Sequence, residues 1–384
     1  MYVNYQNEGT YFFMKNMKNI VKSAAVITSA AALLLTSGCM GDTKWAFKSD
    51  EYYAKNSAWI LNTYISTMGA VNKAAESDSS INIKNMNFDK QEIEGKLAKD
   101  WVYAEAKASC LRMITLNKLV KEYNAKVDQS TFDMQKQMYL NYYYTPSKEL
   151  YEELGVSEDT FVEAYIMPEA NYDAVFNAIY QKGGTKAVSD EDVEKYFTDN
   201  YVTYYYLTYN LKMTDDTGTS VDIDDETKDK YEENFRKYQH MLNDQSKTTK
   251  DVDEQYKVDF GAEESNGATE TQAADDIENA DLKKAVQDAT EKKAEIVTIN
   301  DKVYLIYKGS IKEKAADIKP DDEITEENSG AVSRNSIVSK MKAEEYKEFF
   351  EDELDKLKYV RNDACIAKYS VMRTVDILKK RAGN

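Results

Sequence analysis

The fold of this chain is decided by the stretch Tyr201-Val202-Thr203-Tyr204-Tyr205-Tyr206-Leu207-Thr208-Tyr209-Asn210-Leu211. From Val202 onward it is rich in aromatic and β-branched residues, a composition typical of a β-strand. The sequence before it repeats apolar residues every three to four positions, which predicts amphipathic helices. The stretch therefore marks where a helical region gives way to a mixed α+β segment.

Upstream of this strand the chain is predicted to be helical. Ser157 and Ser189 are each followed by acidic residues, a pattern that predicts a helix N-terminus at both serines. Earlier helices are expected over residues 50–75, from 90 or 97 to 127, and over 128–143.

Downstream of the strand, the pattern is mixed. Residues 295–299 and 303–307 predict two strands joined by a tight turn at Asn300-Asp301. A charged helix is expected over residues 225–245. The segment 246–279 is mostly polar and acidic, which predicts a mobile loop. Helical periodicity returns from Val338 to Leu378.

The predicted class is therefore α+β, mainly α, with a small mixed segment between two helical regions. The corresponding domain plan is a signal peptide at 1–38, a helical region at 39–199, an α+β domain at 200–312, a linker at 313–336 and C-terminal helices at 337–384.

The first residues have the order of an export signal. Lys15, Lys18 and Lys22 precede the uncharged apolar run 23–35, and Thr36-Ser37-Gly38-Cys39 follows it. The run is too short to remain as a spanning helix. It resembles a bacterial lipoprotein signal, which implies that Cys39 is lipidated and becomes the first mature residue.

Two details of this signal leave alternatives open. Thr36 stands where the lipoprotein pattern prefers an aliphatic residue, and an ordinary secretory signal cleaved near Gly38 is the competing interpretation. Because residues 1–13 do not look like the start of a signal, we expect translation to begin at Met14 or Met17.

The composition excludes some classes of function. The net charge of −18 opposes binding to nucleic acid. It also opposes adhesion to anionic lipid headgroups, which favours attachment to the membrane through the lipid alone. Only 14 Gly and 3 Pro accompany 30 Tyr, so few tight turns are expected. This disfavours a two-lobed α/β binding protein, because that fold needs repeated βα turns.

Residues for metal, cofactor or nucleophilic chemistry are scarce. His240 is the only histidine, and Cys110 and Cys365 are the only cysteines after Cys39. We therefore predict no catalytic triad, no metal site and no cofactor. Cys110 and Cys365 form a disulfide or lie buried as separate thiols, and the sequence favours neither.

The order of helical, mixed and helical regions resembles the extracytoplasmic foldases of the PrsA and SurA type. The resemblance is carried by residues 154–161, by 188–197 and by the tail 346–369. It implies a chaperone module built from the N- and C-terminal helical segments, with a small parvulin-type prolyl isomerase domain inserted between them.

The resemblance also implies that the isomerase site has been lost. Members of the family use two histidines on adjacent strands, and the matching positions here are Tyr206 and Tyr304. His240 lies in the charged helix, outside both strands. We therefore predict no catalytic residues and little or no isomerase activity.

Clusters of tyrosine suggest how unfolded chains would be bound. Tyr142, Tyr143 and Tyr144 are predicted either to be core residues or to contact exported polypeptides, since a tyrosine ring is apolar with a polar tip. The resulting hypothesis is a chaperone anchored by lipid on the extracytoplasmic face of the cell membrane. Its alternatives are an active prolyl isomerase that uses tyrosines, and a binding or structural surface lipoprotein without chaperone activity.

Overall fold

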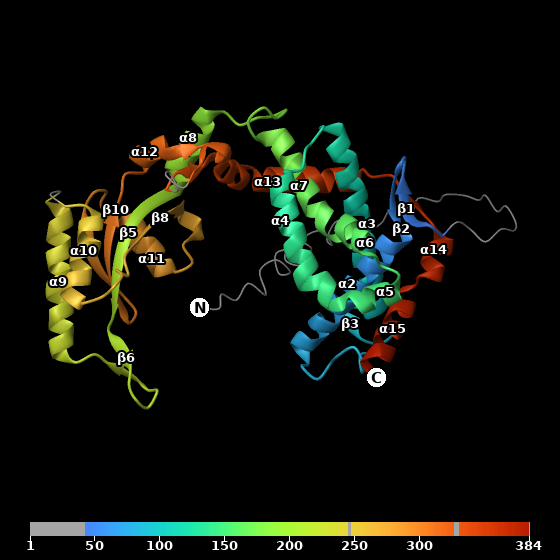
Figure 1. Cartoon of the computed structure of the whole chain (residues 1–384), viewed down its shortest axis with the longest axis horizontal. Coiled ribbons are helices and arrows are strands. Elements are labelled where there is room, and N and C mark those ends of the chain that lie inside the picture. Colours follow the sequence, from blue (N-terminus) through green and yellow to red (C-terminus); the bar gives the residue numbers. More distant parts are fainter. Residues whose placement is uncertain (1–42, 245–246, 326–329, 384) are drawn as a thin grey trace, which may run out of the picture. The chain divides into compact units, whose positions relative to one another are not determined.

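The computed structural model describes residues 43–244, 247–325 and 330–383, in two compact units (Figure 1). Unit 1 combines the chain up to Ala187 with the chain from Ala343 onward, and unit 2 is Val188–Lys342. Most elements are helices, accompanied by small sheets, which confirms the predicted α+β, mainly α class. Cys39 lies outside the described residues.

Unit 1 is a helical body with a small sheet at one side. Its helices are α2 (Asn56–Ser77), α3 (Ala98–Glu122), α4 (Gln129–Tyr139), α5 (Lys148–Leu154), α6 (Glu158–Phe161), α7 (Met167–Tyr180), α14 (Asp363–Lys368) and α15 (Val371–Gly383), with the turns η1 (Leu140–Tyr144), η2 (Thr145–Ser147) and η3 (Val162–Ile166). Its strands are β1 (Trp45–Ser49), β2 (Tyr52–Lys55), β3 (Glu92–Ile93), β4 (Lys96–Leu97) and β13 (Val360–Arg361). Helix α13 (Arg334–Asp355) begins in unit 2 and ends in unit 1.

The N- and C-terminal segments of unit 1 share one sheet and one core. Strand β1 pairs with β2 on one side and with β13 on the other. The ring of Phe349 on α13 lies 6.0 Å from that of Tyr123, which directly follows α3. Val375 on α15 is fully buried beside Val102 on α3. The C-terminal helices therefore stabilise the N-terminal ones directly.

The local signals for helix ends acted as predicted in this unit. Ser157 caps α6 by accepting a hydrogen bond from the backbone N–H of Thr160. Gly155 ends α5 with a φ of 82°, a left-handed conformation that glycine adopts without a steric penalty. The helix expected over 128–143 is α4, which continues after Tyr139 as the π-helical turn η1.

Unit 2 contains a four-stranded antiparallel sheet in the order β8-β5-β10-β9. Its elements are α8 (Asp190–Asn200), β5 (Tyr201–Asn210), β6 (Lys212–Thr214), β7 (Ser220–Asp222), α9 (Asp225–Asn243), α10 (Thr249–Phe260), β8 (Ala268–Ala273), η4 (Ala274–Asp276), α11 (Ala280–Asp288), β9 (Ala294–Ile299) and β10 (Lys302–Lys308). The strand that decided the fold is thus a central strand, and the turn at Asn300 has the positive φ of 54° that a tight hairpin requires.

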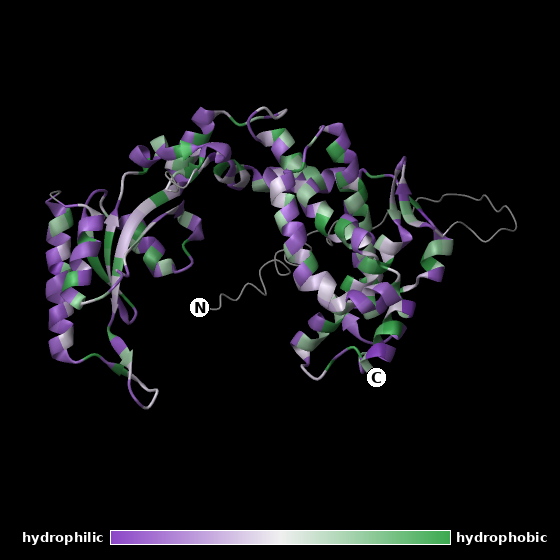
Figure 2. Cartoon of the chain, viewed as in Figure 1, coloured by the Kyte–Doolittle hydropathy of each residue, from purple (hydrophilic) through white to green (hydrophobic). Residues whose placement is uncertain are grey.

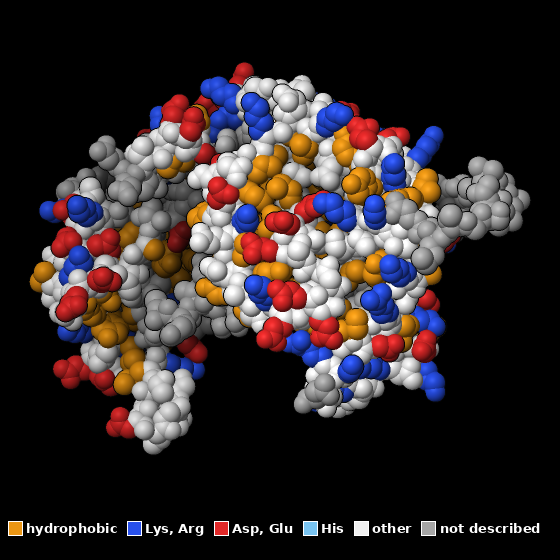
Figure 3. Space-filling model, turned by 45° about the vertical axis from the view of Figure 1, so that its right-hand side comes forward, with side chains coloured by type: hydrophobic (Ala, Val, Ile, Leu, Met, Phe, Trp, Pro, Cys, Tyr) orange, Lys and Arg blue, Asp and Glu red, His pale blue; other side chains and the backbone are white. Residues whose placement is uncertain are grey.

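Alternate residues of β5 face two different cores. Tyr205, Leu207 and Tyr209 pack with residues of α9 and α10, including Phe235 and Val252. Tyr204 and Tyr206 pack on the other face, with Val286 of α11 and Ile306 of β10. Helix α9 is largely hydrophilic except for the side that it buries (Figure 2). Charged side chains of both signs cover much of the molecular face in Figure 3.

The segment 246–279 corrects the sequence prediction of a mobile loop, because it contains α10 and β8. Thr248 and Asp251 form a capping box at the start of α10, and Val252 is fully buried. Strand β8 pairs with β5 through backbone hydrogen bonds. The acidic composition did not prevent regular secondary structure here, because Val252 is buried and β8 pairs with β5.

The predicted linker 313–336 is also partly structured. It holds the end of α12 (Ile311–Lys314), η5 (Ala315–Asp317), β11 (Ile318–Lys319), η6 (Asp321–Glu323), β12 (Val332–Ser333) and the start of α13. The buried Arg334 donates from Nε to Asp190 at 2.8 Å and from Nη2 to the carbonyl of Val188 at 2.6 Å. These bonds hold the first residues of α8 against the start of α13.

Candidate functional site

The structure brings Tyr206 and Tyr304 together on one face of the unit 2 sheet. Their strands are antiparallel neighbours, with Tyr206 opposite Ile306 and Tyr304 opposite Thr208. The two ring centroids lie 6.3 Å apart at an interplanar angle of 50°. Tyr204 adds a third ring, 6.0 Å from that of Tyr206. The positions that the resemblance assigned to histidines therefore form a continuous row of tyrosine rings.

These phenols are poor acid–base groups near neutral pH. Burial raises the pKa of Tyr206 above its ordinary value, with a further contribution from Glu270. Burial likewise raises the pKa of Tyr204, whose hydroxyl accepts a hydrogen bond from Gln272 at 3.0 Å. Each hydroxyl stays protonated and can donate a hydrogen bond, but it cannot take up a proton as imidazole does. His240 is exposed on α9, which covers the opposite face of the sheet.

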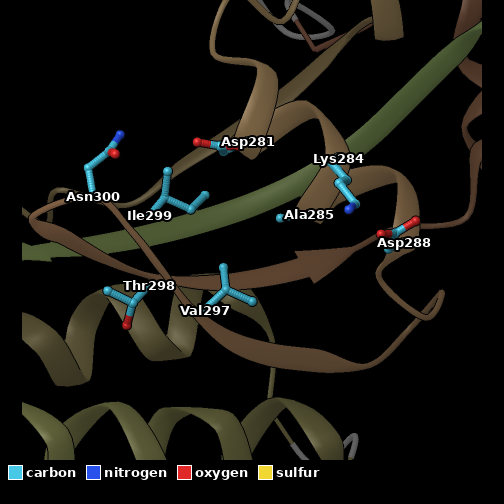
Figure 4. Close-up of a pocket in the computed structure, with 8 residues that line it drawn as sticks. All are labelled: Asp281, Lys284, Ala285, Asp288, Val297, Thr298, Ile299 and Asn300. Carbon is cyan, nitrogen blue, oxygen red and sulfur yellow. The ribbon is translucent and has the colours of Figure 1, made fainter.

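A hollow of about 310 Å³ adjoins the tyrosine row (Figure 4). Asp281, Lys284, Ala285 and Asp288 line it from α11, and Val297, Thr298, Ile299 and Asn300 line it from β9 and its turn. Val297 pairs directly with Tyr304 in the sheet, so the hollow and the tyrosine row are continuous. Ala285, Val297 and Ile299 give the hollow an apolar floor that suits a small apolar group. Asp281, Lys284 and Asp288 make its rim charged. Within the described ranges, no cluster of three or more His, Cys, Asp or Glu residues is arranged to hold a metal ion.

The predicted polypeptide-binding tyrosines divide into two groups. Tyr142 is 73% exposed and Tyr143 is 38% exposed. Tyr144 corrects the expectation, because it is buried in the core of unit 1 and stacks on Tyr151 at 5.2 Å with an interplanar angle of 5°. Its ring supports the fold and is not presented to a partner.

Two methionines extend the exposed tyrosines into a larger apolar surface. Met134 is 69% exposed and Met138 is 46% exposed, and with Tyr142 they recur every four residues along α4 and η1. Tyr143 leans on Tyr139, whose ring lies 5.5 Å away. We call Met134, Met138, Tyr142 and Tyr143 the α4 surface.

The sequence analysis missed the methionines of the α4 surface, although their spacing was a usable signal. Phe132 is the one fully buried side chain of α4, so its inward face is narrow. Met134 is two residues after Phe132 and therefore points away from the core. Met138 and Tyr142 follow at intervals of four residues and share that side of the helix. Gln135, Gln137 and Asn141 flank these positions on the helix surface and are uncharged, whereas Lys136 lies on the side of Phe132. This leaves a neutral strip on an acidic protein.

The two cysteines are structural. Cys110 and Cys365 are both fully buried in the same core cluster and are not joined by a disulfide. Burial raises the pKa of the Cys110 thiol to about 12, so its reactive thiolate form is scarce. Of the two alternatives left open by the sequence, the structure shows separate buried thiols.

The described helices include none that is both long and apolar enough to cross a bilayer.

Comparisons with known proteins give solved structures only. No protein-family model matches the chain, and no curated protein does. The foldase protein PrsA from Streptococcus pneumoniae is 15% identical, with a TM-score of 0.30, and the match covers 74% of this chain and 100% of that one. The peptidylprolyl isomerase PrsA from Bacillus anthracis is 13% identical, with a TM-score of 0.22, covering 65% and 98% of the two chains. PrsA from Bacillus subtilis is 13% identical, with a TM-score of 0.24, covering 78% and 93%. These similar structures are all PrsA proteins, the family named from the sequence resemblance.

Proposed function

We propose that this protein is a lipid-anchored, extracytoplasmic chaperone that holds unfolded exported polypeptides and has little or no prolyl isomerase activity. The observation that carries the proposal is the α4 surface. Four apolar side chains stand exposed along α4 and η1 of a well-packed unit, and among the described rings only Tyr139 contacts one of them, Tyr143. Foldase activity is also the role that the sequence resemblance implies.

The chemistry of the α4 surface suits a binder of low selectivity. Methionine side chains are flexible and polarisable, so they adapt to apolar partners of different shapes. Tyrosine adds a rigid ring with a polar tip. The neutral strip admits apolar segments, while the net charge of −18 keeps a loaded complex soluble.

The tyrosine row supports the second half of the proposal. An isomerase must lower the barrier to rotation of the prolyl amide bond, about 18–20 kcal/mol, through a site that twists the amide. Tyr206 and Tyr304 lie together where the family's histidines are expected, but both offer phenols in place of imidazoles, and burial raises the pKa of Tyr206. We therefore propose that this face retains the shape of the family site without its chemistry.

Membrane attachment is proposed from the sequence of residues 15–39. Replacing Cys39 by Ser tests it, because the variant should appear in the soluble fraction of cells. A Cys39→Ser protein that stays with the membrane would contradict the anchor.

The chaperone role is tested by suppression of aggregation of a chemically denatured client protein. The wild-type chain should suppress aggregation at stoichiometric ratio. A Met134→Ser/Met138→Ser/Tyr142→Ser variant should lose nearly all suppression at this ratio, because the three side chains together lose about 3 kcal/mol of contact, on the order of a hundredfold in affinity. A matched control is Met213→Ser/Val258→Ser, which removes two apolar side chains exposed by 53% and 76% in unit 2. No suppression by the wild type, or equal loss in both variants, would reject the proposal.

A further inference from the structure

A basic and aromatic patch lies on the three-stranded sheet of unit 1. Tyr53, Lys48 and Val360 stand directly opposite one another on β2, β1 and β13, and all three are exposed. Tyr53 is 47% exposed and Val360 is 63% exposed. The inward side of the same sheet is occupied by Phe47, which packs on Trp59. The outward row is therefore an unpartnered sheet face with a lysine at its centre.

A second lysine continues this row. Lys358, two residues before Val360, is exposed. Tyr359 between them lies on the inward side, where its ring centroid is 6.0 Å from that of Phe47 and 5.2 Å from the ammonium group of Lys107. Within the described part of the chain, Lys48 and Lys358 take part in no ion pair. We call Lys48, Tyr53, Lys358 and Val360 the β1 patch.

Neighbouring acids do not cancel this charge. Glu51 is bound to Lys121 at 2.7 Å, and Asp363 is bound to Arg361 at 2.6 Å. Asp50 is the remaining acid in the turn between β1 and β2. The β1 patch is thus locally positive on a chain whose net charge is −18.

The position of the chain just before β1 indicates that the β1 patch faces the membrane. Thr43 is fixed at this side of unit 1, because Lys368 donates to its hydroxyl at 3.4 Å and the carbonyl of Lys44 accepts from the backbone of Asn56. Cys39 is four residues before Thr43, a connection of at most about 14 Å when fully extended. An anchor at Cys39 therefore holds the β1 patch within reach of the bilayer surface.

We infer that the β1 patch docks on the anionic phospholipid headgroups of the membrane and orients unit 1 against it. Lysines near such a surface are attracted to its phosphates, and tyrosine rings favour the boundary between headgroups and acyl chains. A single lipid chain anchors weakly, and a basic patch is the kind of second contact that makes attachment stable. The net charge of the whole chain opposes binding to anionic lipid. The lysines of the β1 patch, however, lie at the side of unit 1 where the chain from Cys39 joins it.

This inference rests on the proposed anchor for the position of the patch, but its test does not need the anchor. Every described core cluster lies within residues 46–378, so a chain that starts at residue 40 keeps the whole fold. This unlipidated chain should sediment with vesicles of phosphatidylcholine that contain phosphatidylglycerol. It should not sediment with vesicles of phosphatidylcholine alone, and added salt should release it.

The variants identify the surface. Lys48→Gln/Lys358→Gln should weaken binding to the anionic vesicles by on the order of twentyfold, about fivefold for each lysine. The control Lys247→Gln/Lys250→Gln changes the net charge equally at two exposed lysines of unit 2 and should bind like the wild type. Tyr53→Ser/Val360→Ser should weaken binding at unchanged charge, with a circular dichroism melt to confirm that the sheet is intact. Should that variant unfold, Tyr53→Ser alone serves the same purpose.

Three outcomes would overturn the inference: equal binding to both kinds of vesicle, equal loss in the Lys247/Lys250 control, or release by free glycerol phosphate at constant ionic strength. The last would mean that the patch binds a soluble phosphate rather than a bilayer. Suppression of aggregation by Lys48→Gln/Lys358→Gln should equal that of the wild type. This separates a failure of membrane docking from a failure of the proposed chaperone function.

Discussion

The hydroxyl of Tyr205 on β5 donates a hydrogen bond of 2.8 Å to Oδ1 of Asp253 on α10. The same carboxylate oxygen accepts from the hydroxyl of Ser265 at 2.5 Å. The central strand is thereby joined to α10 of unit 2. Burial and the neighbouring Asp253 both raise the pKa of Tyr205, so the phenol remains a donor at any physiological pH.

Gly267→Ala should destabilise unit 2, because there is no room for a methyl group beside this hydrogen bond. A Cβ at residue 267 would lie 2.4 Å from Oδ1 of Asp253 and 2.5 Å from the hydroxyl of Tyr205. We expect a loss of about 1–3 kcal/mol in the free energy of unfolding, measured with urea. Gly330→Ala is the matched control, since no atom lies within 4 Å of its Cβ position. Equal stability of the two variants would contradict the close packing at Gly267.

Tyr205→Phe should loosen α10 without unfolding the sheet. The change removes one hydrogen bond to a charged acceptor and leaves the buried ring in place, a loss of about 1.5–3 kcal/mol. Hydrogen exchange should therefore quicken in residues 249–260 more than in β5. The control is Tyr209→Phe, whose hydroxyl makes no hydrogen bond within the described residues and whose ring packs on Phe235. Unchanged exchange in α10 would show that Asp253 does not hold it.

These contacts explain what the sequence could and could not predict. Strand β5 and the Asn300 turn were predictable because their signals are local: β-branched and aromatic residues in one, a tight-turn dipeptide in the other. Strand β8 was not, since Thr269, Glu270, Thr271 and Gln272 show no apolar alternation. Its order comes from pairing with β5, which lies far away in sequence.

The candidate surfaces divide in the same way. The pairing of Tyr206 with Tyr304 followed from placing both on neighbouring strands. Composition could not separate Tyr142 from Tyr144, because consecutive residues of one turn differ only in the direction of their side chains. The sequence also could not predict that Lys48 and Lys358 are neighbours, because they come together only when β1 pairs with β13 of the C-terminal segment.

Unit 1 should become more stable as the pH falls from about 8 to about 5. Burial raises the pKa of Glu105 to about 7, with a smaller contribution from Glu94, while Lys96 and Lys73 oppose the shift. A carboxyl whose pKa is raised on folding stabilises the folded state below its unfolded pKa, and this stability is lost as the pH rises through the folded value. We expect a change on the order of 2 kcal/mol from Glu105 across this window.

Glu105→Gln tests this assignment. The amide that replaces the Glu105 carboxyl cannot ionise, so the difference in the free energy of unfolding between the wild type and the variant should depend on pH. Above neutrality the wild type should lose stability relative to Glu105→Gln. Parallel stability curves for the two proteins would contradict a raised pKa at Glu105.

Tyr142 and Tyr144 should respond oppositely to the same substitution. Tyr144→Ser removes a buried ring that stacks on Tyr151, and it should cost about 3–5 kcal/mol of stability. Tyr142→Ser removes a ring that is 73% exposed and should change stability by less than about 0.5 kcal/mol. Only Tyr142→Ser should weaken binding of an unfolded client by a folded protein. A loss of binding with Tyr144→Ser at unchanged melting temperature would place Tyr144 on the binding surface after all.

The last prediction concerns the tyrosine row, and it separates a lost enzyme from one that uses tyrosines. The wild-type chain should not accelerate isomerisation of a proline-containing peptide above the uncatalysed rate, because imidazole is absent from this face and burial raises the pKa of the Tyr204 and Tyr206 phenols. Tyr206→Phe/Tyr304→Phe keeps both rings and removes both hydroxyls, so it should match the wild type in this assay and in suppression of aggregation. If the wild type is instead active and the double variant is not, the hydroxyls are catalytic and the proposal of a lost site fails. If both are equally active, the shape of the hollow beside Val297 is sufficient to twist the amide, and the activity resides in the pocket rather than in the tyrosines.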